Sequence, residues 1–384
     1  MSDPYTQFRN RTFSAICAVL ALFVTPNAKA IETQAKQAYL IDVATGSVLL
    51  EKNADQPVPP ASMSKLMTIY MVFELLKEGV LSLEDKFLVS KKAWRKGGSK
   101  MFVKVNSQVR VDDLLRGIII QSGNDACIVF AEGLAGSEEA FANQMTKRAR
   151  ELGLKNSMFK NATGWPHPEH VMSVRDIAHL SMRIVQDFPD YYAMFSEKNF
   201  TYNKIKQGNR NPLLYRDSGA DGLKTGYTEA SGYGLAASAL RGDRRVVLAV
   251  NGLPSVRVRS SDSLRLIDWA FRAFENYSLF ENGATVDRVD VWLGTEATVP
   301  VVIGRDIKIT LQRRFRRKMT AKIVFTGPIP APIAKGTPIA RLVVTAPEFQ
   351  TLSIPLHAGI DVKQQGMFGK LGAALRYMIW GSSS

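Results

Sequence analysis

Cysteine is nearly absent from this 384-residue sequence, which has two, Cys17 and Cys127. Cys17 lies in an N-terminal stretch that we expect to be removed, so the mature chain cannot form an internal disulfide and must be stabilised by packing. A lone cysteine can be a catalytic nucleophile, but Cys127 lies in an apolar, helix-like run. A small buried hydrophobe is therefore the favoured interpretation.

Histidine is scarce as well, with four residues. Two of them, His167 and His170, lie in Asn161 to His170, a segment rich in Gly, Pro and His that we interpret as a loop. Their proximity raises the hypothesis of a metal site, but no third ligand accompanies them. We predict that the protein holds no metal and needs no cofactor.

The N-terminus lacks an apolar run of membrane-spanning length. Phe13 to Val24 is apolar apart from one serine, which is shorter than the ~20 residues that span a bilayer. It follows Arg9 and Arg11 and precedes Ala28-Lys29-Ala30, a small-x-small cleavage site. We predict a signal peptide over residues 1–30 and export across the cytoplasmic membrane to the periplasm.

Acidic residues are in deficit, with 35 Asp and Glu against 50 Lys and Arg, a formal net charge of +15. Such a charge favours an anionic partner, which is nucleic acid, anionic lipid or cell-wall polymer. The signal peptide argues against nucleic acid. A hydrophobic content of 46% excludes global disorder, and the length is sufficient for two domains.

Helices and strands are mixed up to Phe280. Gln37 to Leu50 alternates around a glycine and predicts a hairpin, whereas the basic segment Lys91 to Lys104 is expected to be a surface loop. Strands are also predicted over Gly232 to Ala239 and Arg245 to Asn251. Helical periods are visible over Val111 to Ile120, Ala126 to Leu134, Glu138 to Leu152, Val174 to Val185 and Ser260 to Phe274.

The pattern changes after Phe280. Residues 281–363 show short alternating segments separated by Gly and Pro, which predict a small β-sandwich domain. In the last segment, residues 364–384, apolar side chains from Gly366 to Trp380 occupy one broad sector of a helical wheel. Such a helix is about 20 Å long, so we expect it to lie flat on a membrane surface as an anchor. The alternative is a final helix docked on the protein's own core.

A serine and a lysine mark the start of a long apolar run. In Pro60-Ala61-Ser62-Met63-Ser64-Lys65, the two side chains at positions i and i+3 share one helical face. A partly desolvated lysine can act as the base that a serine nucleophile needs. The alternative, a helix-capping serine beside an ordinary surface lysine, is the more common meaning of this short pattern when it stands alone.

Two further motifs follow in order. Ser122-Gly123-Asn124 comes about sixty residues later, and Lys224-Thr225-Gly226 about a hundred residues after that. Each is weak alone, but the set of S-x-x-K, S-x-N and K-T-G resembles that of the penicillin-recognising serine acyltransferases. Within that superfamily the sequence is most similar to the low-molecular-mass penicillin-binding proteins that are D-alanyl-D-alanine carboxypeptidases.

This resemblance covers the whole mature chain and implies its architecture. It implies an α+β fold in which a β-lactamase/DD-peptidase-like catalytic domain, an antiparallel sheet flanked by helices, spans residues 31–280. A small all-β domain and a C-terminal amphipathic helix follow, as the sequence pattern itself indicates. The implied partners are peptidoglycan pentapeptides and β-lactams.

The resemblance also implies catalytic roles. Ser62 is expected to attack the carbonyl between the two terminal D-alanines, with Lys65 as its base. Ser122 is expected to relay a proton to the departing D-alanine, and Asn124 to hydrogen-bond the substrate or fix Lys65.

Four residues are expected to bind substrate. Lys224 supplies a second positive charge near the catalytic serines, and Thr225 binds the terminal carboxylate. Gly226 lets the substrate approach the strand closely. Arg259 offers the fork-like cation that a carboxylate calls for, although Arg257 is only two residues away.

Two departures from the family pattern bear on activity. Some members carry histidine directly after K-T-G, whereas this sequence has Tyr227, which changes the polarity of the expected carboxylate pocket. The loop from Trp94 to Met101 is also short beside better-known members, and it is expected to border the serine.

Two other functions fit parts of the sequence. A class A-like β-lactamase needs a glutamate that activates water, and Glu151 with Leu154 superficially fits, but Lys155 does not. A catalytically silent wall-binding protein would use the basic run Arg313 to Lys318. The intact motif residues argue against a dead site, so a carboxypeptidase is the predicted function.

Overall fold

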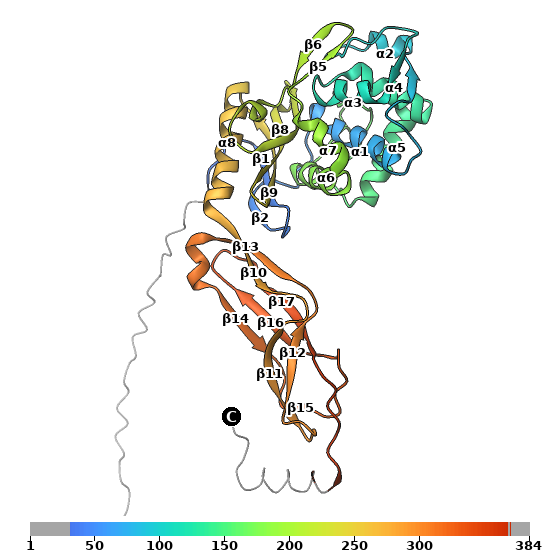
Figure 1. The fold of residues 1–384 in the computed structure, drawn as a ribbon. Coiled ribbons are helices and arrows are strands. Elements are labelled where there is room, and N and C mark those ends of the chain that lie inside the picture. The colour runs from blue at the N-terminus through green and yellow to red at the C-terminus, as the bar shows by residue number, and fades with distance from the viewer. Residues whose placement is uncertain (1–30, 368, 370–384) are drawn as a thin grey trace, which may run out of the picture. The chain divides into compact units, whose positions relative to one another are not determined.

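The computed structural model describes residues 31–367 and residue 369. Its N-terminal part is built on a five-stranded antiparallel sheet in the order β2-β1-β9-β8-β7. Helix α6 (Val174–Asp187) packs on one face and α8 (Val256–Ala273) on the other (Figure 1). The strands are β1 (Gln37–Asp42), β2 (Val48–Lys52), β7 (Ala220–Thr228), β8 (Gly232–Arg241) and β9 (Arg244–Leu253).

Helix α1 (Lys65–Lys77) runs through the hydrophobic core of this part. Most of its residues are buried, which explains why its sequence is apolar all round rather than on one stripe. The short 3₁₀ helix η1 (Ala61–Ser64) leads directly into it. Around it lie α3 (Val111–Ile119), α4 (Asn124–Ala135), α5 (Glu138–Glu151), α7 (Pro189–Tyr192) and the 3₁₀ helix η2 (Ala193–Ser196). The 3₁₀ helix η3 (Pro212–Tyr215) contacts β7 and α8 instead.

Serine caps begin several of these helices. The hydroxyl oxygens of Ser137, Ser173 and Ser255 accept hydrogen bonds from backbone N–H groups in the first turns of α5, α6 and α8. Such caps satisfy donors that have no partner within the helix. They explain why α8 begins at Val256, four residues before the start expected from its apolar period.

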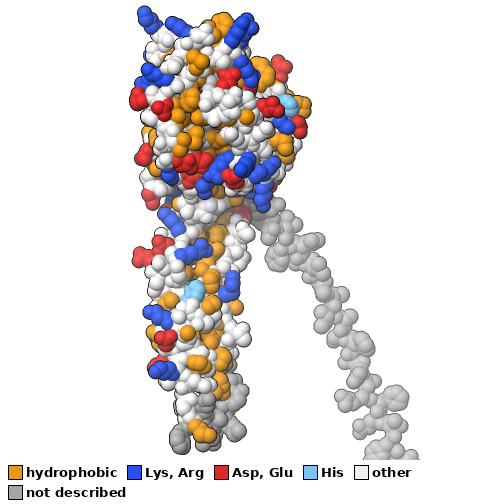
Figure 2. All heavy atoms as spheres, turned by 90° about the vertical axis from the view of Figure 1, so that its right-hand side faces the viewer, with side chains coloured by type: hydrophobic (Ala, Val, Ile, Leu, Met, Phe, Trp, Pro, Cys, Tyr) orange, Lys and Arg blue, Asp and Glu red, His pale blue; other side chains and the backbone are white. Residues whose placement is uncertain are grey.

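Two small hairpins and one short helix surround the end of the N-terminal part that lies away from the sheet. The hairpins are β3 (Lys86–Leu88) with β4 (Gln108–Arg110), and β5 (Asn199–Tyr202) with β6 (Ile205–Gly208). Helix α2 (Lys91–Arg95) forms within the basic segment that was expected to be a loop throughout, because the Ser90 hydroxyl caps it. Figure 2 shows Lys and Arg side chains gathered at this end.

The C-terminal part is all β, as the sequence predicts. A six-stranded sheet in the order β14-β16-β17-β12-β11-β15 and a two-stranded sheet of β10 and β13 enclose a separate apolar core. The elements are β10 (Phe274–Phe280), β11 (Thr285–Trp292), β12 (Thr298–Ile303), β13 (Ile307–Gln312), η4 (Arg313–Lys318), β14 (Thr320–Val324), β15 (Ile329–Pro330), β16 (Pro338–Thr345) and β17 (Leu352–Ala358).

Strand β10 follows α8 without a break and pairs with β13. The second group of strands therefore begins at Phe274, whereas the sequence-based boundary was placed after Phe280. The amphipathic helix expected over 366–380 lies almost entirely outside the described residues. Among the described residues, no helix is both long enough and apolar enough to cross a membrane.

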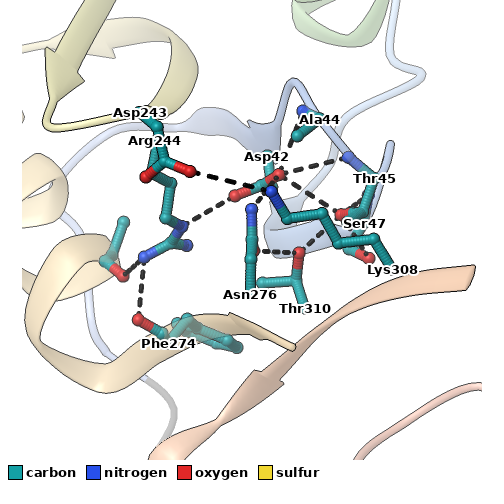
Figure 3. Close-up of polar contacts among 11 residues, drawn as sticks. Asp42, Ala44, Thr45, Ser47, Asp243, Arg244, Phe274, Asn276, Lys308 and Thr310 are labelled. Atoms are coloured by element: carbon teal, nitrogen blue, oxygen red, sulfur yellow. Dashed lines mark hydrogen bonds and ion pairs between the residues drawn. The ribbon is translucent and has the colours of Figure 1, made fainter. Parts of the chain in front are cut away.

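A buried carboxylate joins the sheet to the first strand of the β part (Figure 3). Asp42, at the end of β1, is fully buried, and its Oδ1 accepts hydrogen bonds from the backbone N–H groups of Ala44 and Thr45, at 3.1 and 3.2 Å. Its Oδ2 lies 2.8 Å from Arg244 Nε on β9. Asn276 Nδ2 on β10 donates to Oδ1 at 3.2 Å.

The same network reaches further into both parts. Arg244 Nη1 donates to the backbone oxygens of Ala270 and Phe274, at 3.0 and 2.8 Å, where α8 passes into β10. Thr310 on β13 donates to Asn276 Oδ1 at 2.7 Å and lies 2.5 Å from the Thr45 hydroxyl. The β1–β2 turn, the end of α8 and strands β10 and β13 thus share one set of polar contacts (Figure 3).

We expect Asp42→Ala to lower the free energy of unfolding by about 3–5 kcal/mol, because it leaves the buried Arg244 guanidinium without its carboxylate. Arg313→Ala is the control, since Arg313 pairs with Glu275 on the surface with 53% of its side chain exposed. That exposed pair contributes about 0–1 kcal/mol. Denaturation by guanidinium chloride measures the free energy of unfolding of both variants. An equal decrease in the two variants would contradict a stabilising role for Asp42.

Candidate active site

The first sequence motif forms a tight turn in which the serine and the lysine meet. Lys65 Nζ lies 2.7 Å from Ser62 Oγ, because the 3₁₀ turn of η1 places residues three apart on one side. The lysine is fully buried, and its ammonium also donates to the backbone oxygen of Thr163 at 2.5 Å. The helix-cap alternative does not describe this lysine, since an ordinary surface lysine would be exposed.

Burial changes the charge state of this lysine. Removal from water lowers the pKa of Lys65 from 10.5 to about 8, and the nearby positive charges of Arg210 and Lys96 act in the same direction. At pH 7 roughly one Lys65 in ten is then neutral. A neutral amine at hydrogen-bond distance from a hydroxyl can accept its proton.

The second motif lies in the turn between α3 and α4. The Ser122 side chain is 1% exposed, and its hydroxyl has no hydrogen-bond partner among the described residues. Asn124 begins α4, and its Nδ2 donates to the backbone oxygen of Gly97 at 2.8 Å. The Asp125 carboxylate accepts hydrogen bonds from the backbone N–H groups of Met101 and Phe102, which holds the preceding loop in place.

The third motif lies on β7, beside η1. Lys224 is 2% exposed, and burial, reinforced by the charges of Lys65 and Arg210, holds its pKa well below the usual value. Thr225 is also buried. The charges of the buried Lys65 and of the exposed Arg210 therefore both act on Lys224.

Two glycines allow the chain to close around the nucleophile. A Cβ on Gly226 would lie 2.9 Å from the backbone oxygen of Pro60, and one on Gly164 would lie 2.0 Å from that of Ala61. The resemblance in sequence implies that Gly226 admits the substrate. In the structure, the space left by its missing side chain admits the protein's own turn before Ser62.

The two candidate arginines are distinguished by their burial. Arg259 is 8% exposed, its guanidinium lies 5.7 Å from the ring centroid of Tyr233, and its Nε has no partner among the described residues. Arg257 is exposed. Tyr227, the departure after K-T-G, is half exposed and stacks on Tyr233 with 4.3 Å between centroids.

Sequence reasoning missed two residues that act on the lysines. Thr163 supplies the second oxygen for Lys65, and Asn161 orders its loop by accepting hydrogen bonds from the N–H groups of Thr163 and Gly164. Arg210 lies beside the 94–101 loop, with its Nη1 2.6 Å from Ser99 Oγ. The Asn-Ala-Thr-Gly run was a usable signal for the loop, whereas nothing in the local sequence marks Arg210.

The two histidines do not form a metal site with other residues. Among residues 31–367, no group of three or more His, Cys, Asp or Glu side chains is placed to hold an ion. His170 is buried, its Nδ1 accepts a hydrogen bond from the Lys160 N–H, and burial lowers its pKa to about 4. Cys127 is fully buried, as expected, and burial raises the pKa of its thiol to about 12.

Comparison with known families agrees with the motif set. A model described as D-alanyl-D-alanine carboxypeptidase, of the peptidase S11 family, matches residues 24–254. A second, described as the C-terminal domain of penicillin-binding protein 5, matches residues 274–364. The chain belongs to the S11 family. The predicted family and fold class are thereby confirmed.

Relatives cover nearly the full length. D-alanyl-D-alanine carboxypeptidase DacC of Escherichia coli is 37% identical over 94% of this chain and 92% of its own length. DacA of Haemophilus influenzae is 36% identical over 86% of each chain. The crystal structure of penicillin-binding protein 5 from Haemophilus influenzae has a TM-score of 0.77 at 35% identity, covering 88% of this chain and 99% of that one.

The β-lactamase alternative receives no support from this site. Glu151 is the last residue of α5, and its carboxylate pairs with Arg148 at 2.9 Å. It lies in a helix rather than in a loop beside the serine. The S11 family membership favours the peptidase function instead.

We expect the rate of acylation by a β-lactam to rise with pH and to level off above about pH 8, because only neutral Lys65 accepts the Ser62 proton. Arg210→Gln removes a charge that lowers the pKa of Lys65, so the rising limb should shift to higher pH. Arg210→Lys keeps the charge and serves as the control. Stopped-flow measurement of the acylation rate between pH 5 and 10 gives the rising limb of the pH–rate profile. An unchanged midpoint of this limb in Arg210→Gln would contradict the electrostatic role of Arg210.

Proposed function

We propose that the protein is a serine-type D-alanyl-D-alanine carboxypeptidase that removes the terminal D-alanine from peptidoglycan pentapeptides through an acyl-enzyme on Ser62. Penicillins form the corresponding covalent adduct. The observation that carries the proposal is the 2.7 Å contact of Ser62 Oγ with a fully buried lysine of lowered pKa. Membership of the S11 family supports the same reaction.

Acylation uses the first motif. Neutral Lys65 takes the proton of Ser62, whose oxygen attacks the carbonyl carbon between the two terminal D-alanines. The Ser62 backbone N–H, at the start of η1, is one of the donors that stabilise the resulting oxyanion. The backbone oxygen of Thr163 holds the ammonium that forms on Lys65 and keeps it beside the reacting oxygen.

Collapse of the intermediate uses the second and third motifs. The leaving D-alanine needs a proton on its nitrogen, and Ser122, with its hydroxyl buried and unpaired, relays that proton. The positive charge of Lys224 assists the Ser122 relay. The Asn124 amide binds the peptide group on the N-terminal side of the penultimate D-alanine, and this contact replaces the hydrogen bond from Asn124 to Gly97.

The departing residue is recognised by its carboxylate. Thr225 and Arg259 bind this group, and the guanidinium of Arg259 suits it because its Nε has no hydrogen-bond partner among the described residues. Gly226 lets β7 lie against the Ser62 turn, so the edge of β7 is the place where the extended peptide adds as a further strand. Hydrolysis then requires Lys65 to act a second time, now on a water molecule.

The rest of the chain serves delivery to the cell wall. Residues 1–30 direct export and are removed, 31–273 form the catalytic domain, 274–363 form the small β domain, and 364–384 anchor the protein. The anchor holds it on the outer, periplasmic face of the cytoplasmic membrane. There it trims newly made wall peptides, a step in wall biogenesis that influences cell shape.

We expect Ser62→Ala to abolish both D-alanine release and covalent labelling by penicillin, because the acyl group then has no oxygen to attach to. Ser196→Ala, which removes an exposed hydroxyl on η2, is the control and should keep full activity. Mass spectrometry of a pentapeptide muropeptide measures loss of one alanine. Release by Ser62→Ala at the wild-type rate would sink the proposal.

We expect truncation after Gln365 to release an active enzyme from membranes, because it removes the amphipathic segment from Gly366 onward. Fractionation of cells, with penicillin labelling of each fraction, measures the distribution. A chain with Phe368→Glu and Leu371→Glu is the full-length companion, since two charges on the apolar sector should have the same effect. Retention of both variants on membranes would refute the anchor.

A further inference from the structure

An exposed tryptophan and an unpaired lysine lie at the edge of the active site. The Trp165 side chain is 45% exposed, and Lys96 Nζ lies 4.8 Å from its ring centroid. A Cβ built on Gly98 would lie 2.8 Å from Asn124 Nδ2 and 3.1 Å from Trp165 Cζ3. The indole therefore reaches the immediate surroundings of the Asn124 amide.

The tryptophan is held firmly in this exposed position. The backbone N–H of Trp165 donates to Asn161 Oδ1 at 3.0 Å, and the backbone oxygen of Trp165 accepts a hydrogen bond from Asn161 Nδ2 at 2.9 Å. Thr163, two residues earlier, binds Lys65. The ring rests on Gly97 and Gly98, whose lack of side chains leaves room for it. A rigid aromatic surface next to a catalytic loop loses little freedom when a ligand stacks on it.

Lys96 has a charge that no carboxylate of the described residues neutralises. Lys96 forms no ion pair with any residue of the described chain, whereas the neighbouring Lys92 pairs with Glu138 at 3.0 Å. The nearest acidic residue on the Trp165 loop, Glu169, is bound to Lys160 at 3.1 Å. Lys96 directly precedes Gly97, whose backbone oxygen accepts a hydrogen bond from Asn124 Nδ2 at 2.8 Å.

The proposed substrate passes this point. In the proposed reaction, Asn124 binds the peptide group that precedes the penultimate D-alanine. In the structure, the Asn124 side-chain amide donates a hydrogen bond to the backbone oxygen of Gly97. The residue that contributes that peptide group is third from the end of the pentapeptide. Its side chain therefore leaves the peptide next to Gly97, Gly98 and the Trp165 ring.

We propose that Trp165 and Lys96 form a subsite for the side chain of the third residue from the substrate's end, and that this side chain is long, aliphatic and ends in a carboxylate. The inference rests on the proposed carboxypeptidase function. The aliphatic stem lies on the indole face, and the terminal carboxylate pairs with the ammonium of Lys96. The subsite is a specificity determinant and takes no part in proton transfer.

Two matched tripeptides test the subsite in the full-length protein. Nα-acetyl-Nε-succinyl-L-Lys-D-Ala-D-Ala carries a carboxylate at the end of the third side chain, and Nα,Nε-diacetyl-L-Lys-D-Ala-D-Ala ends in a neutral amide. We expect kcat/KM to be roughly two- to fivefold higher for the succinyl substrate, the range of a partly exposed ion pair. Equal values would overturn the subsite. Failure to release D-alanine from either would count against the carboxypeptidase function instead.

Lysine variants locate the effect. Lys96→Gln should bring the ratio of the two kcat/KM values close to one, and Lys96→Arg should keep it. Loss of the Lys96 charge also changes the pKa of Lys65, but that change affects both substrates equally and leaves the ratio unaltered. Lys100→Gln is the control, since Lys100 donates to the Trp94 backbone nearby. An equal fall of the ratio in Lys100→Gln would indicate that the succinyl carboxylate responds to the general positive potential of this loop rather than to Lys96, and would overturn the subsite.

A tryptophan variant tests the stacking surface. Trp165→Leu should lower kcat/KM for both tripeptides while leaving acylation by 6-aminopenicillanic acid unchanged, because that β-lactam carries no side chain that reaches the indole. Acylation by 6-aminopenicillanic acid thus reports on the Ser62 turn alone. A fall of the same size in all three reactions would assign Trp165 a purely structural role and remove it from the subsite.

Discussion

The buried ammonium of Lys65 is the constraint on which the catalytic half depends. A lysine taken out of water needs hydrogen-bond acceptors, and here these are Ser62 Oγ and the backbone oxygen of Thr163. The Asn161 side chain orders the loop that presents this oxygen, and Gly164 lets the loop approach the turn before Ser62. Helix α1 then carries the lysine into the core. The same packing that buries Lys65 therefore also fixes Ser62, the proposed nucleophile, beside its proposed base.

Positive charge accumulates in this closed space. Lys65 and Lys224 are both buried, and Arg210 lowers the pKa of each. Such an arrangement keeps a fraction of Lys65 neutral near physiological pH, which a proton acceptor requires. It also leaves a field that favours a ligand with a carboxylate, since an anion relieves the repulsion among the cations. In the proposed mechanism, one electrostatic feature thus serves both proton transfer and the choice of an anionic substrate.

The sequence was most informative where chemistry and periodicity coincide. The motif residues Ser62, Lys65 and Ser122 could be named because their types and order are specific, and most helices because their apolar period is clear. It was least informative at transitions. No Gly or Pro stands between Val256 and Phe280, so nothing marked the change from α8 to β10 at Phe274. Arg210 was missed for a related reason: tertiary structure brings it to the site, where Asn211 Nδ2 ties its segment to the Gly222 backbone oxygen at 2.8 Å.

Backbone conformation around the site explains why the motif residues alone would not suffice. Ala61, just before the nucleophile, has a φ of +49°, and Ser122 has a φ of +67°. Each is a left-handed conformation that costs a non-glycine residue about 1–3 kcal/mol and persists only where the surroundings enforce it. The close approach of Gly226 to Pro60 and the bonds from the 101–103 loop to Asp125 provide that enforcement. The motifs supply the reactive groups, and the packing of their neighbours fixes those groups where a substrate carbonyl meets them.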